Sequence, residues 1–581
     1  MFLENINGPE DVKKISIENL QTLADETRAA VINRISNIGG HKGPNLGVVE
    51  LTVALHYVFN SPTDKFVWDV SHQSYPHKIL TGRKEAYLDA EHFNDVTGYT
   101  NPNESNHDFF KVGHTSTSVS LALGLAKGRD LNNGTENIVA IIGDGSLSGG
   151  EALEALDYAG EYNKNLIIVV NDNDQSIAEN HGGIYKTLKN LRETNGEAPN
   201  NFFKGFGLDY IYIDEGHNIP ALIECFKKVK DIDHPIVVHV HTIKGKGLSY
   251  AEENRESWHA GGPFNIEDGS PKNKPTKPAD TTVHDSLVEL LETDDKAVIF
   301  NAATPASLGF IGEERQGYAK RGRFVDVGIA EENAMAMASG AAKNGATAVF
   351  GTMAPFLQRT YDQLSHDLCL NNNPATILVL NPGVYGMNSD THIALSDIQF
   401  FAHVPNLLYL APTSKEEYVK MFKYATSQKA HPVAIRVPRR FTTDGIADDT
   451  DYSLTNKAKL INKGNEIAII AVGCLVPLAK EAAKAYKDKT GKDITVISPR
   501  FLTGLDSELL KSLQGDHRLV ITMEDGYLDG GYGQRIASFY GNSDMKVINL
   551  GLNKEFYSDF KPDELLKENG ISVENLLALM D

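Results

Sequence analysis

The chain has few of the features that mark extracellular or membrane proteins. Its 581 residues include only 3 cysteines, which lie far apart and each within an apolar stretch, so we expect small buried side chains. No apolar run reaches the roughly 20 residues that a membrane-spanning helix needs. The first residues, MFLENINGPEDVKK, lack the basic-then-apolar order of a signal peptide. We therefore expect a cytoplasmic protein that does not interact with membranes.

The chain also has fewer basic than acidic residues. The chain has 56 Lys and Arg against 77 Asp and Glu, which gives a formal net charge of −21 at pH 7. Binding to a nucleic-acid backbone needs a basic surface, because the cations of the protein displace counterions from the phosphates. The balance argues against nucleic acid and anionic membrane as partners. An anionic ligand would need locally gathered cations or helix N-termini.

Short apolar runs alternate with helical periodicity along the whole chain. Runs such as NIVAIIGDG, NLIIVVND, ATILVL and EIAIIAVG are apolar throughout, as expected for parallel strands that are covered on both faces. Polar stretches at 266–280 and 439–459 divide the chain, which is too long for one core. We predict an α/β fold of three successive domains with mainly parallel sheets, at 1–270, 280–440 and 455–581.

Polar residues follow two of these runs at the point where each strand should end. Asp144 lies in a Gly-Asp-Gly turn after the first run, and Asn173 follows the second. The glycines and the helix N-terminus behind the turn suit a diphosphate, which a bare carboxylate would repel. A divalent cation removes that conflict. The carboxylate, the amide oxygen, a backbone carbonyl of Gln175 and two phosphate oxygens would form an octahedral Mg²⁺ shell. The alternative is a common Asp-Gly turn followed by an Asn-capped loop.

These motifs resemble a known family. Gly-Asp-Gly, followed by Asn at the end of the next strand, is the thiamine-diphosphate fingerprint of transketolase-like enzymes. More narrowly, the sequence resembles the 1-deoxy-D-xylulose-5-phosphate synthases in GGHKGPNLG (39–47), WDVSHQSYPHK (68–78), GHTSTSVS (113–120), FVDVGIAE (324–331) and FLQRTYDQLSHD (356–367). The resemblance implies a homodimer that binds thiamine diphosphate and Mg²⁺. It also implies a diphosphate domain first, a pyrimidine domain second and a transketolase C-terminal-like domain last.

The activity that the resemblance implies is the joining of pyruvate to D-glyceraldehyde 3-phosphate. The reaction releases CO₂ and forms 1-deoxy-D-xylulose 5-phosphate for isoprenoid, thiamine and pyridoxal synthesis. Two alternatives stay open. One is a ketol or acyloin transferase that uses a different or unphosphorylated aldehyde, and the other is a catalytically weak cofactor-binding protein retained for interaction or regulation. The presence of Asp144, Asn173 and Glu331 argues against the second alternative.

The resemblance also implies roles for individual residues. Glu331 follows the apolar run FVDVGIA at an expected strand end, and it would bind the cofactor's pyrimidine ring and favour the tautomer that deprotonates the thiazolium carbon. From spacing alone, an acid at a helix N-terminus is the better interpretation of Glu331. Arg439 would bind the substrate phosphate. The other implied residues are His41, His259 and His392 for catalysis; His72, Gly113, His114, Thr115, Gly145, Ser146, Asn173 and Phe356 for the cofactor; and Asp144, Asn173 and Gln175 for the metal.

The sequence does not decide the roles of two lysines or the chemistry of the site for the acceptor aldehyde. Lys244 and Lys246 could bring positive charge near the diphosphate or belong to a solvated loop. The positions that depart from the family pattern are Glu332 and Asn333 in place of Gln-His, Met353 in place of a tyrosine, Asn381 in place of a phosphate-binding arginine, and Asn388 in place of an aspartate. These changes predict an altered acceptor pocket, in which Arg440 or Lys42 could restore the lost charge.

Overall fold

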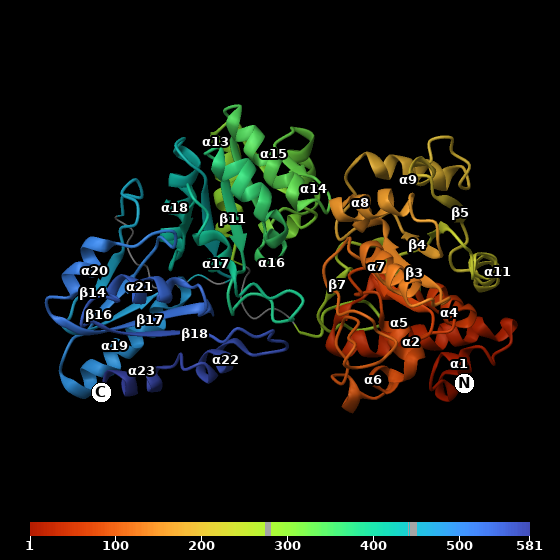
Figure 1. Cartoon of the computed structure of the whole chain (residues 1–581), viewed down its shortest axis with the longest axis horizontal. Helices are drawn as coiled ribbons and strands as arrows, with labels where there is room; N and C mark the ends of the chain where they lie inside the picture. Colours follow the sequence, from red (N-terminus) through yellow and green to blue (C-terminus); the bar gives the residue numbers. More distant parts are fainter. Residues whose placement is uncertain (274–279, 440, 442–449) are drawn as a thin grey trace. The chain divides into compact units, whose positions relative to one another are not determined.

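The structure is a computed structural model that describes residues 1–273, 280–439, 441 and 450–581 (Figure 1). The chain forms two compact units. The first comprises Met1–Pro278 with Gly328–Ala330, and the second comprises Ala279–Val327 with Glu331–Asp581. Among the described residues, no helix combines the length and the apolar character needed to cross a bilayer.

The first unit is built on a parallel sheet of five strands in the order β2-β3-β4-β6-β5. A short antiparallel pair, β1 with β7, lies apart from it. The strands are β1 Gly40–His41, β2 Lys65–Trp68, β3 Ile138–Gly143, β4 Leu166–Asp172, β5 Asp209–Ile213, β6 Pro235–His241 and β7 Ala260–Gly261. The helices are α1 Pro9–Val12, α2 Leu20–Ile38, α3 Gly43–Leu46, α4 Val49–Val58, α5 Tyr75–Lys78, α6 Glu85–Leu88, α7 Ser118–Leu131, α8 Gly150–Ala159, α9 Gly183–Glu193, α10 Phe202–Gly205, α11 Ile219–Val229 and α12 Ser249–Glu253.

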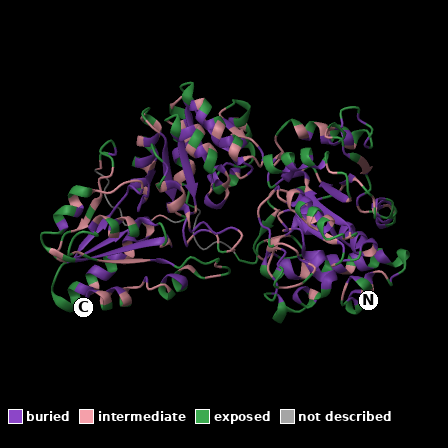
Figure 2. Ribbon diagram, viewed as in Figure 1, coloured by how far each residue is buried: buried purple, intermediate pink, exposed green. Residues whose placement is uncertain are grey.

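Helices cover both faces of this sheet, which explains why the residues Ile138–Ile142 of its strand β3 are all apolar. Val139 and Ile141 of β3 pack into a core with α2, α4 and α11. Ala140 and Ile142, which alternate with them, pack into a second core with α7, α8 and α9. Because successive side chains of a strand point to opposite faces, a strand buried on both sides has no polar position. Figure 2 shows these central strands in the colour of buried residues.

The second unit contains two further sheets. One has six parallel strands in the order β12-β13-β11-β10-β8-β9, and the other has five in the order β14-β16-β15-β17-β18, of which only the β14–β16 pairing is antiparallel. The strands are β8 Ala297–Asn301, β9 Phe324–Asp326, β10 Thr347–Met353, β11 Thr376–Leu380, β12 Leu408–Leu410, β13 Val433–Val437, β14 Lys459–Asn462, β15 Glu466–Ala471, β16 Thr495–Ser498, β17 His517–Tyr527 and β18 Lys546–Leu552. The helices are α13 Thr282–Thr293, α14 Gly312–Lys320, α15 Glu331–Lys343, α16 Ala354–Leu357, α17 Asp397–Ala402, α18 Lys415–Ser427, α19 Val476–Thr490, α20 Ser507–Leu513, α21 Tyr532–Tyr540, α22 Pro562–Glu568 and α23 Val573–Met580.

A buried arginine joins the two sheets of the second unit. Arg436 on β13 donates to Asp397 at 2.7 and 3.1 Å and to Asp525 on β17 at 2.8 Å. All three side chains are at most 3% exposed. A buried arginine is stable only when carboxylates neutralise it, so these contacts fix the two sheets together. The predicted α/β fold with mainly parallel sheets is confirmed, while the boundaries 1–270, 280–440 and 455–581 stay a prediction.

The cysteines are free thiols in two different settings. Cys225 and Cys369 are buried, as predicted. Cys474 is partly exposed, and its thiol donates to the carboxylate of Asp525 at 3.2 Å.

Candidate functional site

Asp144 and Asn173 lie at neighbouring strand ends, as the sequence predicts. The strands β3 and β4 pair in parallel with Gly143 opposite Asn171, so the residues that follow them share the carboxyl edge of the sheet. Asp144 is only 1% exposed. Its carboxylate accepts hydrogen bonds from the backbone N–H of Asn173 at 3.4 Å and of Gln175 at 3.1 Å, and from the amide of Asn180 at 2.6 Å. The Gly-Asp-Gly turn continues as a short 3-10 helix, Asp144–Ser148, that leads into α8.

Two amide oxygens beside this carboxylate indicate room for a cation. Oδ1 of Asn173 and Oδ1 of Asn180 are buried and accept no hydrogen bond within the described part of the chain. Burial, and then the neighbouring Asp172, raise the pKa of Asp144. A divalent ion would keep that carboxylate ionised and could take the amide oxygen of Asn173 as a ligand. The residues therefore fit the predicted Mg²⁺.

The protein alone supplies few ligands for this ion. Over the described ranges, no group of three or more His, Cys, Asp and Glu residues could hold a metal. A hard cation that takes one carboxylate and neutral oxygens from the protein needs further oxygen ligands from its partner. Metal and diphosphate are therefore expected to bind together.

Two arginines hold the loop that carries the predicted metal ligands Asn173 and Gln175. Arg192 on α9 pairs with Asp172 at 2.7 Å and with Asp174 at 2.7 Å, on either side of Asn173. Arg255 donates to the carbonyl of Asn173 at 3.2 Å. Sequence reasoning missed both arginines, which lie outside every motif.

Lys244 is buried next to the same loop. It is 2% exposed and donates to the carbonyl of Ser176 at 2.5 Å, so it does not belong to a solvated loop. Burial lowers its pKa to about 8, although the nearby Asp144 opposes that shift. Lys244 therefore places positive charge beside the predicted diphosphate site, whereas Lys246 is half-buried.

Three of the predicted histidines form one cluster in the first unit. The ring centroid of His41 lies 5.1 Å from that of His72 and 5.7 Å from that of His259, and the last two are stacked 5.3 Å apart. The β1–β7 pairing brings His41 opposite Ala260, next to His259. Asn45 donates to the carbonyls of His41 at 2.9 Å and His72 at 2.7 Å, and so joins their segments.

Burial keeps two of these rings neutral. It lowers the pKa of His41 to about 4 and that of His259 well below the usual value, with Lys244 adding to both shifts. At neutral pH each ring therefore has one nitrogen that donates and one that accepts a hydrogen bond. His114 and Thr115, after the buried Gly113, lie half-buried in the loop before α7.

Glu331 does not lie at a strand end, and that expectation is wrong. The strand β9 stops at Asp326, and Glu331 is the first residue of α15, where an acid complements the helix dipole. The side chain is buried, and its Oε2 accepts no hydrogen bond from any described residue. The same oxygen lies 3.7 Å from Nη1 of Arg359. Burial raises the pKa of Glu331, and Arg359 partly opposes the shift. The carboxyl group thus fits a ligand that offers a hydrogen-bond donor.

Other predicted residues of the second unit fall into two groups. Phe356 on α16 and the buried His392 are in edge-to-face contact, with ring centroids 5.8 Å apart. Arg439 is exposed, and its Nη1 donates to the carbonyl of Gly386 at 3.3 Å. The backbone N–H of Asn381 donates to the carbonyl of Val437, on the strand that precedes Arg439, at 2.9 Å. Asn381 and Arg439 therefore both lie near the carboxyl end of β13.

The remaining altered positions are spread over different surroundings. Met353 is the half-buried last residue of β10. Asn388 is exposed and donates to the carbonyl of Phe560 at 3.3 Å. In the first unit, the ammonium of Lys42 lies over the rings of Trp258 and Phe264, 4.5 Å from each centroid. Arg440 lies outside the described residues.

Comparisons with known proteins assign this fold and site to a class. Residues 3–197 and 194–242 match the family described as 1-deoxy-D-xylulose-5-phosphate synthase, 279–443 match the transketolase pyrimidine binding domain, and 456–576 match the transketolase C-terminal domain. The fold is therefore transketolase-like, with three domains along the chain.

Full-length relatives narrow the class. The 1-deoxy-D-xylulose-5-phosphate synthase of Carboxydothermus hydrogenoformans is 37% identical over 613 residues, which cover 99% of this chain and 98% of that protein. The enzyme of Clostridium beijerinckii is 36% identical over 99% of this chain and 98% of its own length. Synthase 1 of Geobacter sulfurreducens is 37% identical, with 99% and 96% covered. The chain belongs to the 1-deoxy-D-xylulose-5-phosphate synthase family, which confirms the predicted resemblance.

Proposed function

We propose that this chain joins pyruvate to D-glyceraldehyde 3-phosphate, releasing CO₂ and forming 1-deoxy-D-xylulose 5-phosphate. The observation that carries the proposal is the identity of 37% over 99% of the chain to a curated synthase. It favours this reaction over a transferase with another acceptor and over a weak cofactor-binding protein. The product would serve isoprenoid, thiamine and pyridoxal synthesis, and the enzyme would act as a cytoplasmic homodimer.

The first unit would hold the diphosphate part of thiamine diphosphate. Asp144, Asn173 and the carbonyl of Gln175 would bind Mg²⁺, while Gly145, Ser146, Gly113, His114 and Thr115 would contact the cofactor. When bound, thiamine diphosphate supplies the electron sink that cleavage of the carboxylate from pyruvate needs. The burial and the raised pKa of Asp144 support the metal, because an ionised carboxylate in such a place is costly without a cation.

The second unit would control a proton on the pyrimidine ring. Glu331 presents a buried oxygen that receives no hydrogen bond from the described residues, and its raised pKa matches a group that shares a proton with a ring nitrogen. Phe356 and His392 would contact the same ring and the substrate. The neutral rings of His41 and His259 would donate to or accept from the substrate's oxygens, and His72 would contact the cofactor.

The phosphate of the acceptor would depend mainly on Arg439, which gives a test of the proposed reaction. A charge-assisted pair contributes roughly 1.5–3 kcal/mol. Because residue 381 is asparagine, one such pair is missing. The preference for the phosphorylated aldehyde over glyceraldehyde, measured as a ratio of kcat/KM values, should therefore be about 10- to 150-fold smaller than with arginine at both 381 and 439. We expect Asn381→Arg to enlarge the ratio of the two kcat/KM values and Arg439→Ala to nearly abolish the preference.

Arg321→Ala serves as the matched control, because Arg321 is a surface arginine directly after α14 that pairs with Glu292. It should leave the ratio unchanged. A wild-type preference above about a thousandfold that survives Arg439→Ala would assign the phosphate to another residue. Failure to form product from any aldehyde would instead reject the proposed reaction.

A further inference from the structure

One buried carboxylate joins two segments that the proposed function assigns to the cofactor. Asp69 directly follows β2 and is 0% exposed. Its Oδ1 accepts from the backbone N–H of Ser116 at 2.9 Å, and its Oδ2 from that of Ser118 at 3.0 Å. Ser118 is the first residue of the 14-residue helix α7, so the charge also compensates a helix N-terminus. The end of β2 is thereby tied to the loop that contains His114 and Thr115.

The backbone on both sides of this contact is strained. Val70 and Ser71 have φ of 57° and 60°, and Ser116 has φ of 74°, all in the left-handed region that favours glycine. For the β-branched Val70 this conformation is a clear outlier. Such a conformation is unfavourable for a residue other than glycine and persists only where the surroundings impose it. The strained pair turns the chain immediately before His72, so the direction of that histidine depends on the contacts of Asp69 and Ser71.

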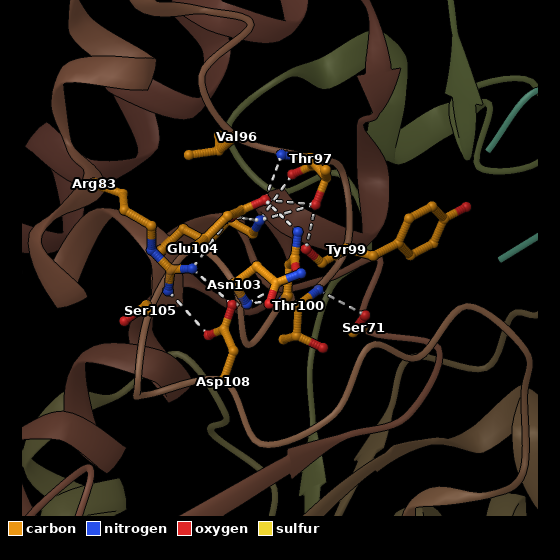
Figure 3. A network of polar contacts seen from close by, with 12 residues as sticks. Ser71, Arg83, Val96, Thr97, Tyr99, Thr100, Asn103, Glu104, Ser105 and Asp108 are labelled. Carbon is orange, nitrogen blue, oxygen red and sulfur yellow. Dashed lines mark hydrogen bonds and ion pairs between the residues drawn. The ribbon is translucent and has the colours of Figure 1, made fainter. Parts of the chain in front are cut away.

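A second set of hydrogen bonds holds Ser71 in this conformation. Its hydroxyl donates to the carbonyl of Val112 at 2.9 Å. The same hydroxyl accepts from the backbone N–H of Thr100 at 2.9 Å (Figure 3). The loop around Thr100 is fixed in turn by ion pairs of Arg83 with Glu104 at 3.3 Å and with Asp108 at 2.7 Å (Figure 3). The strained turn is therefore held by hydrogen bonds to a loop that ion pairs fix in place.

Ser116 extends the connection to the Gly-Asp-Gly turn. Its hydroxyl donates to the carbonyl of Ser146 at 2.8 Å. Gly149, just before α8, approaches so closely that an added Cβ would lie 2.1 Å from the same hydroxyl oxygen. Three segments, ending in His72, Thr115 and Ser146, thus meet around one carboxylate.

We propose that Asp69 is a positioning residue for thiamine diphosphate, a role that rests on the proposed function. Its charge holds Val70, Ser71 and Ser116 in left-handed conformations, and these fix the three segments in one arrangement. Asparagine at this position would present an NH₂ group to one of the two N–H donors. One hydrogen bond would be lost, and the strained residues could relax to ordinary φ values.

Asp64, before the other end of β2, provides a matched control. It is 4% exposed, accepts from the backbone and side-chain amides of Asn137 at 2.7 and 3.0 Å, and accepts from the backbone N–H of Asn60 at 2.7 Å. Asp64→Asn therefore disturbs the same kind of contact on the same strand. It leaves the three cofactor segments untouched.

The test is calorimetric titration of thiamine diphosphate, at saturating Mg²⁺, into the full-length wild type, Asp69→Asn and Asp64→Asn, with thermal unfolding of each. We expect both variants to lower Tm, but only Asp69→Asn to raise the Kd of the cofactor, by at least about tenfold. Adding Val70→Gly to Asp69→Asn should recover part of the affinity, since glycine adopts positive φ without strain. If the single variant does not fold, the double variant is compared with Val70→Gly alone, and a smaller loss of cofactor affinity is expected.

Equal cofactor affinity in wild type and Asp69→Asn, or equal losses in Asp69→Asn and Asp64→Asn, would overturn the proposal. Wild-type protein that fails to bind the cofactor would instead reject the proposed function. The two failures are therefore distinct.

Discussion

Replacing Asp144 with alanine should abolish metal-dependent binding of thiamine diphosphate while the chain stays folded. The variant loses the one carboxylate at the predicted metal site and keeps only neutral oxygens such as Oδ1 of Asn173. Residues that only support metal ligands typically contribute 10- to 100-fold in affinity, so the loss of a ligand should exceed about 100-fold at any accessible Mg²⁺ concentration. Calorimetric titration of the cofactor with and without Mg²⁺ measures this loss.

Thermal unfolding separates this effect from misfolding. Alanine at 144 leaves the donors of Asn173, Gln175 and Asn180 unpaired. It also removes a carboxylate whose ionised form burial and Asp172 disfavour, so in the absence of metal the two effects oppose each other and the variant should still unfold cooperatively. Asp157→Ala, at an exposed position of α8, is the control and should bind the cofactor as the wild type does. Tight cofactor binding to Asp144→Ala, or metal-independent binding to the wild type, would show that no metal–diphosphate site exists at this turn.

Glu331→Gln should slow hydrogen–deuterium exchange at the thiazolium carbon of bound thiamine diphosphate by about 10²–10⁴-fold, the usual contribution of acid–base catalysis. Glutamine keeps the shape of the buried side chain, so cofactor affinity should stay within about an order of magnitude. What changes is the ability of Oε2, which receives no hydrogen bond from the described residues, to hold a proton at the pyrimidine ring. NMR of the quenched cofactor after timed incubation in D₂O measures the exchange rate.

Glu332→Gln provides the control for this experiment. Glu332 is the neighbouring, half-buried acid on the first turn of α15, and its replacement should leave exchange near the wild-type rate. Near-normal exchange in Glu331→Gln would mean that another carboxylate acts on the pyrimidine ring. If only Glu332→Gln slows the exchange, the carboxylate that acts on the pyrimidine ring is that of Glu332.

The sheets could be predicted because burial on both faces leaves a continuous apolar signal. In β3, Val139 and Ile141 enter one core while Ala140 and Ile142 enter the other, so every position is apolar. The apolar run FVDVGIA wrongly predicted a strand that reaches Glu331. It belongs to the edge strand β9, which pairs only with β8 and stops at Asp326, and Gly328 then turns the chain at φ 75°. Apolar composition did not reveal where this edge strand ends.

The neighbouring positions of Asp144 and Asn173 could be predicted because they depend on local features of two adjacent strands. Asp144 and Asn173 each follow an apolar run, and parallel pairing brings such positions together. Arg192 and Arg255 could not be found, because they reach Asn173 and its neighbours from helices and loops elsewhere in the chain. Asp69 lies in a recognisable motif, yet no pattern of residue types indicates that Val70 is left-handed.

The central claim is that this chain forms 1-deoxy-D-xylulose 5-phosphate, and ¹³C NMR of the wild-type reaction tests it most directly. The protein is incubated with Mg²⁺, thiamine diphosphate, uniformly ¹³C-labelled pyruvate and unlabelled D-glyceraldehyde 3-phosphate. The account predicts that one labelled carbon leaves as CO₂, while the other two appear as the methyl and carbonyl carbons of 1-deoxy-D-xylulose 5-phosphate. Unchanged pyruvate, or a labelled product that forms only with a different aldehyde, would contradict it.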